Sequence, residues 1–418
     1  PGVIALAGVV WFWGLGHYTR RRPFWDELLE TLRVIGIIAI MDAAVVFIAG
    51  WQLPRSWLLV TWCLAAVLVP LFRTFLKHGL ILIGTWQRPT VIVGTGENAR
   101  EAAAALSSEP LLGLDIVAFL RLADEAADKL NSIELGYRRI PVLTLGSHPE
   151  IILNDLGRPH IVVALEADSL QKERGLIEQL GLLCPGINVV PPLRGLPLFS
   201  FEVSHFISHD VLFLGLPSNL SRRSSRYAKR LFDVLGASIL LLVLSPLLIS
   251  VALLVRGTTG NGVLYKHRRI GRKGEPFTCY KFRTMVVGAD EILHGILASD
   301  PKARTEWESN YKLRSDPRVT PLGHVLRKLS LDELPQLWNV LKGDMSLVGP
   351  RPIVAAELVR YGDHADNYLE TGPGITGLWQ ISGRNNLSYS SRIYLDTWYA
   401  KNWSLWFDVV ILFRTLKA

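Results

Sequence analysis

Two adjacent carboxylates, Asp332 and Glu333, are the residues of this chain best suited to phosphate chemistry. They lie in residues 330–341, where Pro335 follows Asp332 by three residues. A helix with its N-cap at Asp332 would hold this proline in the first turn, where the missing N–H costs nothing. Such a helix places four apolar side chains on one face: Leu334, Leu337, Trp338 and Leu341. Its dipole would keep a carboxylate ionised, and its free N–H groups could bind a phosphate.

An acidic pair alone is typical of a solvated helix start, so the neighbouring residues decide the interpretation. Four cations flank the pair in the sequence: Lys281 and Arg283 lie upstream, Arg327 just before it and Arg351 after it. The first two alternate with aromatic residues, and the last stands between two prolines. A guanidinium fork matches the oxygens of a phosphate. Cations fixed around a carboxylate pair therefore suit a substrate that carries phosphates.

Four strings of residues resemble the bacterial sugar transferase family, whose members are monotopic phosphoglycosyl transferases. The strings are residues 281–285, 330–348, 350–352 and 373–380. The resemblance extends from about Ser221 to the end of the chain, and matched strings of this length are specific. Members of the family transfer a sugar-1-phosphate from a nucleotide sugar to a polyprenyl phosphate and release UMP. The resemblance therefore implies an enzyme, a phosphotransferase that works at a membrane.

The resemblance also implies roles for individual residues. Asp332 would be the nucleophile that attacks the sugar-bearing phosphorus and forms an aspartyl-phosphosugar intermediate. Glu333 would help to hold Mg²⁺, which neutralises the diphosphate. Asp396 would act on the substrate side by orienting the metal or a cation. The phosphates would be bound by four cations: Lys281, Arg283, Arg327 and Arg351.

The composition indicates a membrane protein with anionic partners. The chain has 418 residues, enough for two or three domains, and 49% of them are hydrophobic. The mean hydropathy of +0.27 is high for a soluble protein. A net charge of +8 favours phospholipid, nucleotide or nucleic acid, and because no nucleic-acid signature occurs, lipid and nucleotide remain. The three cysteines have no CxxC spacing and indicate neither a metal site nor a disulfide.

Residues 1–87 are predicted to form transmembrane helices. The chain begins at Pro1 within an apolar run over residues 1–15, and we expect its natural N-terminus to lie upstream. Residues 32–51 and 57–86 contain two further apolar stretches of about 20 residues, flanked by tryptophans and arginines. Buried helices of a soluble protein are the alternative. Arginine clusters before the second helix and after the third put the soluble regions in the cytoplasm by the positive-inside rule.

Residues 88–217 have the pattern of a Rossmann-like α/β domain. Apolar strands are predicted at residues 90–93, 116–120, 161–165 and 187–190. The first is followed by Gly94-x-Gly96-x-x-Ala99, the glycine turn of dinucleotide-binding folds. The acid that would bind a ribose is absent, because Arg121 follows the second strand. Nucleotide binding is therefore left open and redox catalysis is disfavoured, since the glycines could serve only the tight turn.

An irregular, proline-containing linker should lead to a mainly α-helical catalytic domain at residues 218–418. Its most apolar segment, residues 234–255, is long enough to span a membrane. However, Ser245-Pro246 interrupts the segment, and both of its flanks are basic. We therefore expect a re-entrant membrane helix over residues 230–256, which the resemblance also implies. A proline-kinked spanning helix is the alternative.

Two further segments of this domain differ from its apolar helix. Residues 288–310 are polar and helix-forming, and no role follows from their pattern. From Trp398 onward, aromatic residues that include Trp403 mix with cations. This mixture predicts an interfacial amphipathic helix at the C-terminus.

The long form of the chain is similar to family members that begin O-antigen, capsular or exopolysaccharide repeats. The resemblance implies transfer of galactose-1-phosphate from a UDP-sugar to undecaprenyl phosphate, at the cytoplasmic side of the bacterial inner membrane. Glucose-1-phosphate or N-acetylhexosamine-phosphate transfer stays open, because no hydroxyl-reading pocket is visible. A non-catalytic regulator of polysaccharide assembly would share the helices but would not need the acidic pair among cations. The implied partners are the UDP-sugar, undecaprenyl phosphate and the bilayer, without nucleic acid, and a homodimer stays open.

Overall fold

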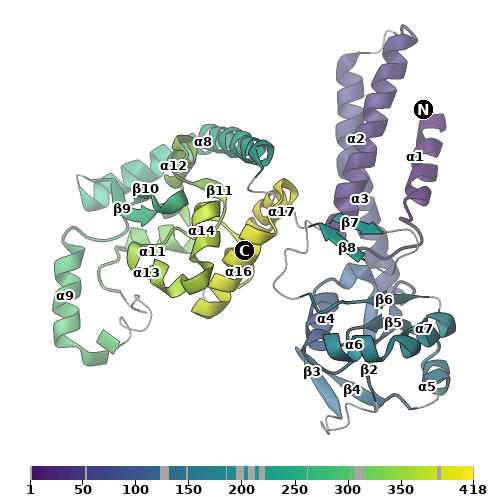
Figure 1. Ribbon diagram of the computed structural model, residues 1–418. Coiled ribbons are helices and arrows are strands. Elements are labelled where there is room, and N and C mark those ends of the chain that lie inside the picture. Colours follow the sequence, from purple (N-terminus) through teal and green to yellow (C-terminus); the bar gives the residue numbers. More distant parts are fainter. Residues whose placement is uncertain are drawn as a thin grey trace. The chain divides into compact units, whose positions relative to one another are not determined.

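The computed structural model describes residues 2–417 apart from short gaps. The gaps are residues 52–53, 123–130, 147–148, 185, 194–201, 206–211, 216–221, 261, 303, 306–312, 314–315 and 384–386. The predicted boundary at residue 217 and the end of the polar segment 288–310 lie outside the described residues. The chain divides into two compact units, Pro1–Arg194 and Gly195–Ala418, and each is described by itself (Figure 1).

Three helices begin the first unit: α1 (Gly2–Gly14), α2 (Phe24–Ile48) and α3 (Arg55–Leu82). By length and composition α2 and α3 can cross a membrane, as the sequence predicts. The only acid of the second predicted span, Asp42, accepts a hydrogen bond from Trp62 Nε1 at 3.0 Å. Toward the other end of the pair, Glu27 of α2 forms an ion pair with Lys77 of α3. Polar contacts at two levels thus hold α2 against α3.

A six-stranded sheet follows these helices. Its strands are β1 (Arg88–Val93), β2 (Leu114–Arg121), β3 (Ser132–Leu135), β4 (Arg138–Thr144), β5 (His160–Val163) and β6 (Ile187–Val189). The strand order is β3-β4-β2-β1-β5-β6, and all neighbours are parallel except β3 and β4. Without β3, this is the order of a doubly wound, Rossmann-like sheet, as predicted. Connecting helices are α4 (Glu97–Ser107), η1 (Pro110–Leu112), α5 (Pro149–Asp155), α6 (Ala167–Lys172) and α7 (Arg174–Leu183).

The glycine turn of this sheet holds one of the protein's own carboxylates where a bound anion would lie. Gly94 has a φ of 117°, and a Cβ there would meet the carbonyl oxygen of Ala164 at 2.7 Å, so glycine is required for the turn itself. At the start of α4, the backbone N–H of Asn98 donates to Glu166 Oε1 at 2.8 Å. A Cβ at Gly96 would lie 2.8 Å from the same oxygen. The carboxylate of Glu166 therefore uses the helix N-terminus that dinucleotide-binding folds offer to a pyrophosphate.

The second unit begins with a hairpin of β7 (Glu202–His205) and β8 (Leu212–Gly215), where the sequence predicts an irregular linker. The strands pair between the prolines of this segment, which the prediction weighed too heavily. The helix α8 (Arg223–Thr259) then continues without interruption through Pro246. The elements that follow are β9 (Leu264–Ile270), η4 (Arg272–Gly274), β10 (Pro276–Phe282), α9 (Ala289–Ser299), α11 (Pro321–Lys328), η5 (Leu331–Glu333), α12 (Gln336–Lys342), β11 (Ser346–Val348), α13 (Ala355–Leu358), η6 (Val359–His364), α14 (Ala365–Thr371), β12 (Gly374–Thr376), α15 (Leu378–Ile381), α16 (Tyr389–Lys401) and α17 (Leu405–Thr415).

Both halves of α8 pack against the same compact body. Near the start of the helix, Ala237 is buried in a cluster with residues of β10, α12 and β11. Near its end, Val251 and Val255 are buried against Phe282 of β10 and Leu326 of α11. At 1.5 Å per residue, these two contact regions are about 21 Å apart along the helix. The remaining face of α8 exposes apolar side chains, including Leu231, Leu235, Ile239, Leu242, Val243, Ile249 and Leu253.

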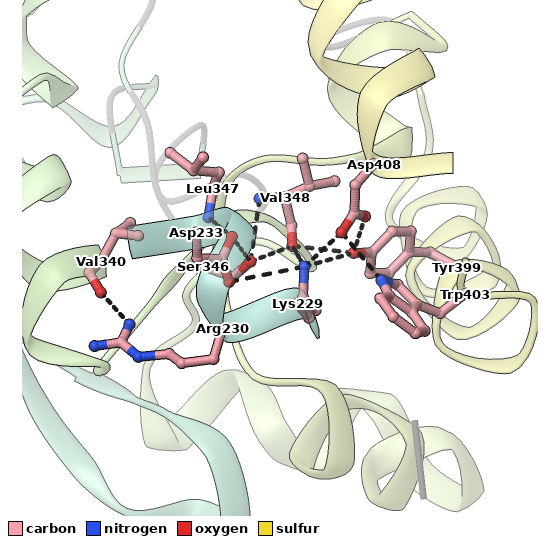
Figure 2. A network of polar contacts seen from close by, with 10 residues as sticks. All are labelled: Lys229, Arg230, Asp233, Val340, Ser346, Leu347, Val348, Tyr399, Trp403 and Asp408. Atoms are coloured by element: carbon pink, nitrogen blue, oxygen red, sulfur yellow. Dashed lines mark hydrogen bonds and ion pairs between the residues drawn. The ribbon is translucent and has the colours of Figure 1, made fainter. Parts of the chain in front are cut away.

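A buried polar network ties the start of α8 to the strand that leads to Arg351 (Figure 2). Lys229 pairs with Asp408 of α17 at 2.7 Å and donates to the carbonyl oxygen of Val348 at 3.1 Å. Asp408 is fully buried and also accepts hydrogen bonds from Tyr399 Oη at 2.7 Å and Trp403 Nε1 at 3.1 Å. Trp403, which the sequence assigns to the membrane interface, is therefore a core residue, because its indole N–H has a buried carboxylate as partner.

Candidate active site

The acidic pair lies in a short 3-10 turn and not at the N-cap of a helix, so that prediction is wrong. The turn η5 follows Ser330, whose backbone is left-handed with a φ of 56°. The helix α12 begins only after Pro335. The reversal at Ser330 turns the chain sharply after α11, and the pair is held between two helices. Of the predicted apolar face, Leu337 is buried but Trp338 is 55% exposed.

Asp332 is a buried carboxylate with a raised pKa. Its side chain belongs to a residue that is only 9% exposed. Burial and the adjacent charge of Glu333 raise its pKa to about 6, although Lys281 and Arg327 favour the ionised form. Near neutral pH the carboxylate is therefore largely ionised, but it is poorly solvated. A desolvated anion surrounded by cations is suited to attack an electrophilic phosphorus.

Glu333 is held ionised by an ion pair with Lys281. The Lys281 ammonium lies 2.7 Å from Glu333 Oε1. Burial opposes ionisation of Glu333, but the charge and hydrogen bond of Lys281, helped by Arg351 and Arg269, lower its pKa. The two carboxylates of the pair thus differ in state: Glu333 is firmly ionised, while Asp332 titrates near neutrality.

The side chain of Asn339 sets the position of Lys281 relative to the pair. Asn339 is fully buried in α12, and its amide binds the backbone of β10 through both its oxygen and its nitrogen. Its Oδ1 accepts from the N–H of Tyr280 at 3.1 Å, and its Nδ2 donates to the carbonyl oxygen of Thr278 at 2.7 Å. Because Lys281 follows Tyr280 in β10, this clamp fixes the lysine opposite Glu333. The residue lies in a matched string, but its spacing alone does not reveal the role.

Arg327 and Thr284 join α11 to the same site. Arg327 Nε donates to the buried Thr284 Oγ1 at 2.9 Å. The close approach of the two segments depends on Gly323, where a Cβ would lie only 2.1 Å from the carbonyl oxygen of Thr284. The guanidinium of Arg327 is thereby oriented while its charge acts on Asp332. Arg283, in contrast, packs beside Gly262 and has no contact with the pair; its Nε is buried without a hydrogen-bond partner among the described residues.

Arg351 reaches the site from the turn after β11. The strands β11 and β12 run parallel, and a Cβ at Gly374 would lie 2.1 Å from the N atom of Gly349, so their ends must be glycines. Arg351 is one of the cations that favour ionised Glu333, and it also favours ionised Asp396. Arg269 supports the turn by donating from Nη1 to the carbonyl oxygen of Pro352 at 3.2 Å. Arg351 thus lies between two acids that are far apart in the sequence.

Beside Arg351 is a second arginine that the sequence reasoning missed. The guanidinium carbons of Arg351 and Arg392 lie 5.8 Å and 5.1 Å from the ring centroid of Trp379. Several buried polar atoms here have no hydrogen-bond partner in the described part of the chain: Trp379 Nε1, Gln380 Oε1, Tyr389 Oη and Arg392 Nε. Trp379 belongs to a matched string, whereas no motif contains Arg392. Two cations and unused donors, linked to the acidic pair through the charge of Arg351, can bind a further part of an anionic substrate.

Asp396 is buried on α16 and does not contact the acidic pair. It is 3% exposed and accepts a hydrogen bond from Tyr361 Oη at 2.9 Å. Burial raises its pKa to about 7, against the effects of Tyr361, Arg351 and Arg392. The role in orienting the metal or a cation stays a prediction; the charges that act on Asp396 are those of Arg351 and Arg392.

The donor atoms fit Mg²⁺ only together with a substrate. Within the described residues, no three His, Cys, Asp or Glu side chains gather into a site made by the protein alone. Mg²⁺ commonly binds through one or two carboxylates plus substrate phosphates and water. Asp332 and Glu333 supply carboxylates of this kind, and Glu333 is the one held ionised. The pair therefore fits a metal that arrives with a diphosphate.

The candidate site combines a buried carboxylate with cations, and the same unit carries a helix long and apolar enough to enter a membrane. Residues 224–418 match the model of the bacterial sugar transferase family. Together with the relatives below, this match shows that the chain belongs to that family, in its long form. It is a membrane-associated enzyme of the sugar phosphotransferase type.

Similarity to curated relatives extends over the whole chain. It is 46% identical over 420 residues to the undecaprenyl-phosphate galactose phosphotransferase of Salmonella typhimurium, covering 100% of this chain and 86% of that protein. It is 42% identical to the UDP-galactose-lipid carrier transferase of Erwinia amylovora, covering 99% and 85%. It is 37% identical over 272 residues to the UDP-glucose:undecaprenyl-phosphate glucose-1-phosphate transferase of Escherichia coli, covering 62% and 54%. Sugar-phosphate transfer to a lipid carrier is the reaction that these relatives support.

Proposed function

We propose that this enzyme transfers galactose-1-phosphate from UDP-galactose to undecaprenyl phosphate and releases UMP, as the first membrane step of O-antigen, capsular or exopolysaccharide synthesis. The observation that carries the proposal is Asp332, a buried carboxylate that faces two cations and titrates near pH 6. The names of the two long relatives favour galactose. The name of the third keeps glucose-1-phosphate as the alternative, and N-acetylhexosamine-phosphate remains a second one.

The reaction has two steps at one phosphorus. A carboxylate oxygen of Asp332 forms a bond to the sugar-bearing phosphorus, the bond to the bridging oxygen breaks, and UMP leaves with that electron pair. A phosphate oxygen of undecaprenyl phosphate then attacks the same phosphorus and frees the carboxylate. Lys281 and Arg327 neutralise charge next to the nucleophile, and Arg351 with Arg392 binds the nucleotide side of the donor. Glu333 would hold Mg²⁺, which when bound supplies charge neutralisation for the diphosphate.

The membrane arrangement of α8 forms part of the proposal. A helix that crossed the bilayer would have its two ends on opposite sides, yet both halves of α8 pack against one compact body. This supports a re-entrant helix that exposes its apolar face to one leaflet of the inner membrane, with the catalytic unit on the cytoplasmic side. Labelling of Ser224→Cys and Thr258→Cys in intact spheroplasts, in a background with the exposed Cys63 replaced by serine, tests it. Both positions should be shielded from an impermeant reagent until the membrane is opened; labelling of Thr258→Cys alone would mean a spanning helix.

The covalent step is tested with the purified full chain and UDP-galactose alone. Intact-protein mass spectrometry should show one hexose phosphate attached to the enzyme at Asp332, with UMP released in a burst that matches the number of active sites. Asp332→Asn keeps the shape of the side chain and should give neither. A non-catalytic regulator would release no UMP even with lipid added. An unmodified enzyme that turns over normally once undecaprenyl phosphate is present would refute the covalent route, and a panel of UDP-sugars identifies the sugar.

A further inference from the structure

A second cationic cleft lies in the catalytic unit, and it shares no residue with the candidate active site. Its walls come from the first turns of α8, from η4, from the chain between α12 and β11, and from residues 371–373. The cleft has a volume of about 100 Å³. Four cations line it: Arg226, Lys229, Arg230 and Arg272.

Two of these cations are already committed to the protein. Lys229 is paired with Asp408, and Arg230 donates to the carbonyl oxygens of Val340 at 2.5 Å and Leu341 at 2.6 Å, at the end of α12 (Figure 2). These contacts hold the two side chains in the wall of the cleft, and the Lys229 ammonium and the two terminal nitrogens of Arg230 are bonded to groups of the protein itself.

The carboxylates of the cleft are also committed. Asp233 accepts from Ser346 Oγ at 2.9 Å and from the N–H of Leu347 at 3.0 Å. Asp344 pairs with Lys342 at 3.0 Å. Neither carboxylate is therefore available to neutralise the remaining arginines.

Arg226 and Arg272 are left as a pair of like charges. Among the residues that the structure describes, no carboxylate lies within ion-pair distance of either. Arg272 Nε donates to the carbonyl oxygen of Glu370 at 2.9 Å, which aims the rest of its guanidinium group into the cleft. Burial and the nearby charge of Arg226 lower the pKa of Arg272, while the charge of Glu370 acts in the opposite direction. Two guanidinium groups that repel each other, that of Arg226 half-buried and that of Arg272 exposed, are stabilised by an anion between them, and their planar forks fit the oxygens of a phosphate.

The position on α8 indicates where such a phosphate occurs. The exposed aliphatic side chains of α8 begin at Leu231, five residues after Arg226, or about 7.5 Å along the helix axis. A group bound at Arg226 therefore lies at the depth where the hydrocarbon region of a membrane gives way to its phosphates. We propose that this cleft is a phosphate-binding site at the membrane surface, filled by a phospholipid head group or by free phosphate. The proposal does not depend on the sugar-transfer reaction.

The test compares two pairs of arginines on the full chain in a neutral detergent. Calorimetric titration is carried out with two probes, dihexanoylphosphatidylglycerol and inorganic phosphate. In Arg226→Gln/Arg272→Gln, binding of the preferred probe should weaken about a hundredfold, because each arginine that no longer binds the phosphate should cost roughly tenfold in affinity. The matched control is Arg222→Gln/Arg223→Gln, which removes the same charge from exposed positions on the same end of α8 and should bind as the parent does. A second control, Lys281→Gln/Arg351→Gln, removes binding at the active site and should keep binding in the cleft.

The two probes distinguish the sources of the phosphate. Tighter binding of the short-chain lipid identifies a head-group site, and equal or tighter binding of inorganic phosphate identifies a site for the free ion. Equal weakening in both arginine pairs would reduce the cleft to general surface charge and overturn the proposal, as would unchanged binding in Arg226→Gln/Arg272→Gln. Arg226→Lys/Arg272→Lys keeps the charge without the fork and should bind with intermediate affinity, which excludes misfolding as the cause.

Discussion

Replacing Asp332 by asparagine should stop transfer and, at the same time, make the donor-free protein more stable. The reason is the burial of an ionisable group beside a like charge. Burial and Glu333 raise the pKa of Asp332 from its ordinary 3.8 to about 6. The folded state therefore prefers the protonated carboxyl, and above pH 6 it holds an anion that the unfolded chain would solvate better. Asparagine has the same shape and no charge to bury.

The size of the effect follows from the same pKa. A rise from 3.8 to about 6 is equivalent to about 3 kcal/mol at 1.36 kcal/mol per pKa unit. Below pH 3.8 both states of the wild type are protonated, so asparagine brings no gain there. Between pH 3.8 and 6 the gain grows, and above pH 6 it is complete. For a unit of this size, the midpoint of thermal unfolding at pH 8 should rise by roughly 6–12 °C.

The assay is thermal unfolding of both proteins in detergent, without metal and without donor, at a series of pH values from 4 to 8. Asp363→Asn, which removes an exposed carboxylate from the same unit, is the matched control and should change little at any pH. The UMP burst is measured in parallel. A loss of stability in Asp332→Asn at pH 8, or a gain that is the same at pH 4 and pH 8, would refute the argument from burial. Normal turnover of the variant would refute the nucleophile.

Three further predictions concern the charges around this carboxylate, the anchor of α8 and the glycine turn. The rate of the UMP burst should rise with pH as Asp332 ionises near pH 6. Lys281→Met should shift this rise to higher pH and Glu333→Gln to lower pH, because each variant removes a charge that acts on Asp332. Shifts of both variants in the same direction would contradict this. Lys229→Met leaves Asp408 buried without its cation and should lower the free energy of unfolding of the unit by about 3–5 kcal/mol. Lys229→Met/Asp408→Asn should recover much of this loss when unfolding is measured for all members of a double-mutant cycle. Full additivity of the two changes would show that the side chains do not interact. Glu166→Gln should leave sugar-phosphate transfer unchanged. NAD should not bind the wild type in a calorimetric titration, because the carboxylate of Glu166 uses the N-terminus of α4. Binding of NAD to the wild type would contradict this explanation.

The sequence predicts which residues gather in the candidate site better than it predicts the contacts that hold them there. Matched strings pointed to Asp332, Glu333, Lys281 and Arg351, and the structure brings their charges within reach of one another. The clamp formed by Asn339 joins α12 to β10 across many intervening residues, and nothing local distinguishes this amide from an exposed one. The same holds for contacts that exist only in the folded unit, such as the hydrogen bond from Tyr361 to Asp396.

Local sequence patterns also fail to predict some features of the fold. The strand β4 contains Pro141, which is typical of a strand break, yet the strand forms: Pro141 lies opposite Ser132 of β3, and the pairing with β2 begins only at Val142. Pro246 was expected to interrupt α8, yet the helix continues through it. The N-cap predicted at Asp332 failed because the left-handed backbone of Ser330, a conformation with no sequence signal outside glycine, places a 3-10 turn there.

The arrangement of charges links binding of the proposed donor to the ionisation state of Asp332. Asp332 is already hard to ionise, and a diphosphate placed beside it would raise its pKa further. Attack on phosphorus therefore requires positive charge to act on the carboxylate at the moment the donor is bound. Lys281 is placed for this, since it favours the ionised form of both acids while its ammonium is bonded to Glu333. When another cation pairs with Glu333, the Lys281 ammonium can bind the diphosphate while its charge still acts on Asp332. The Asp332 carboxylate is then most reactive when the donor and the cations are present together. Without the donor, it is about half protonated near pH 6.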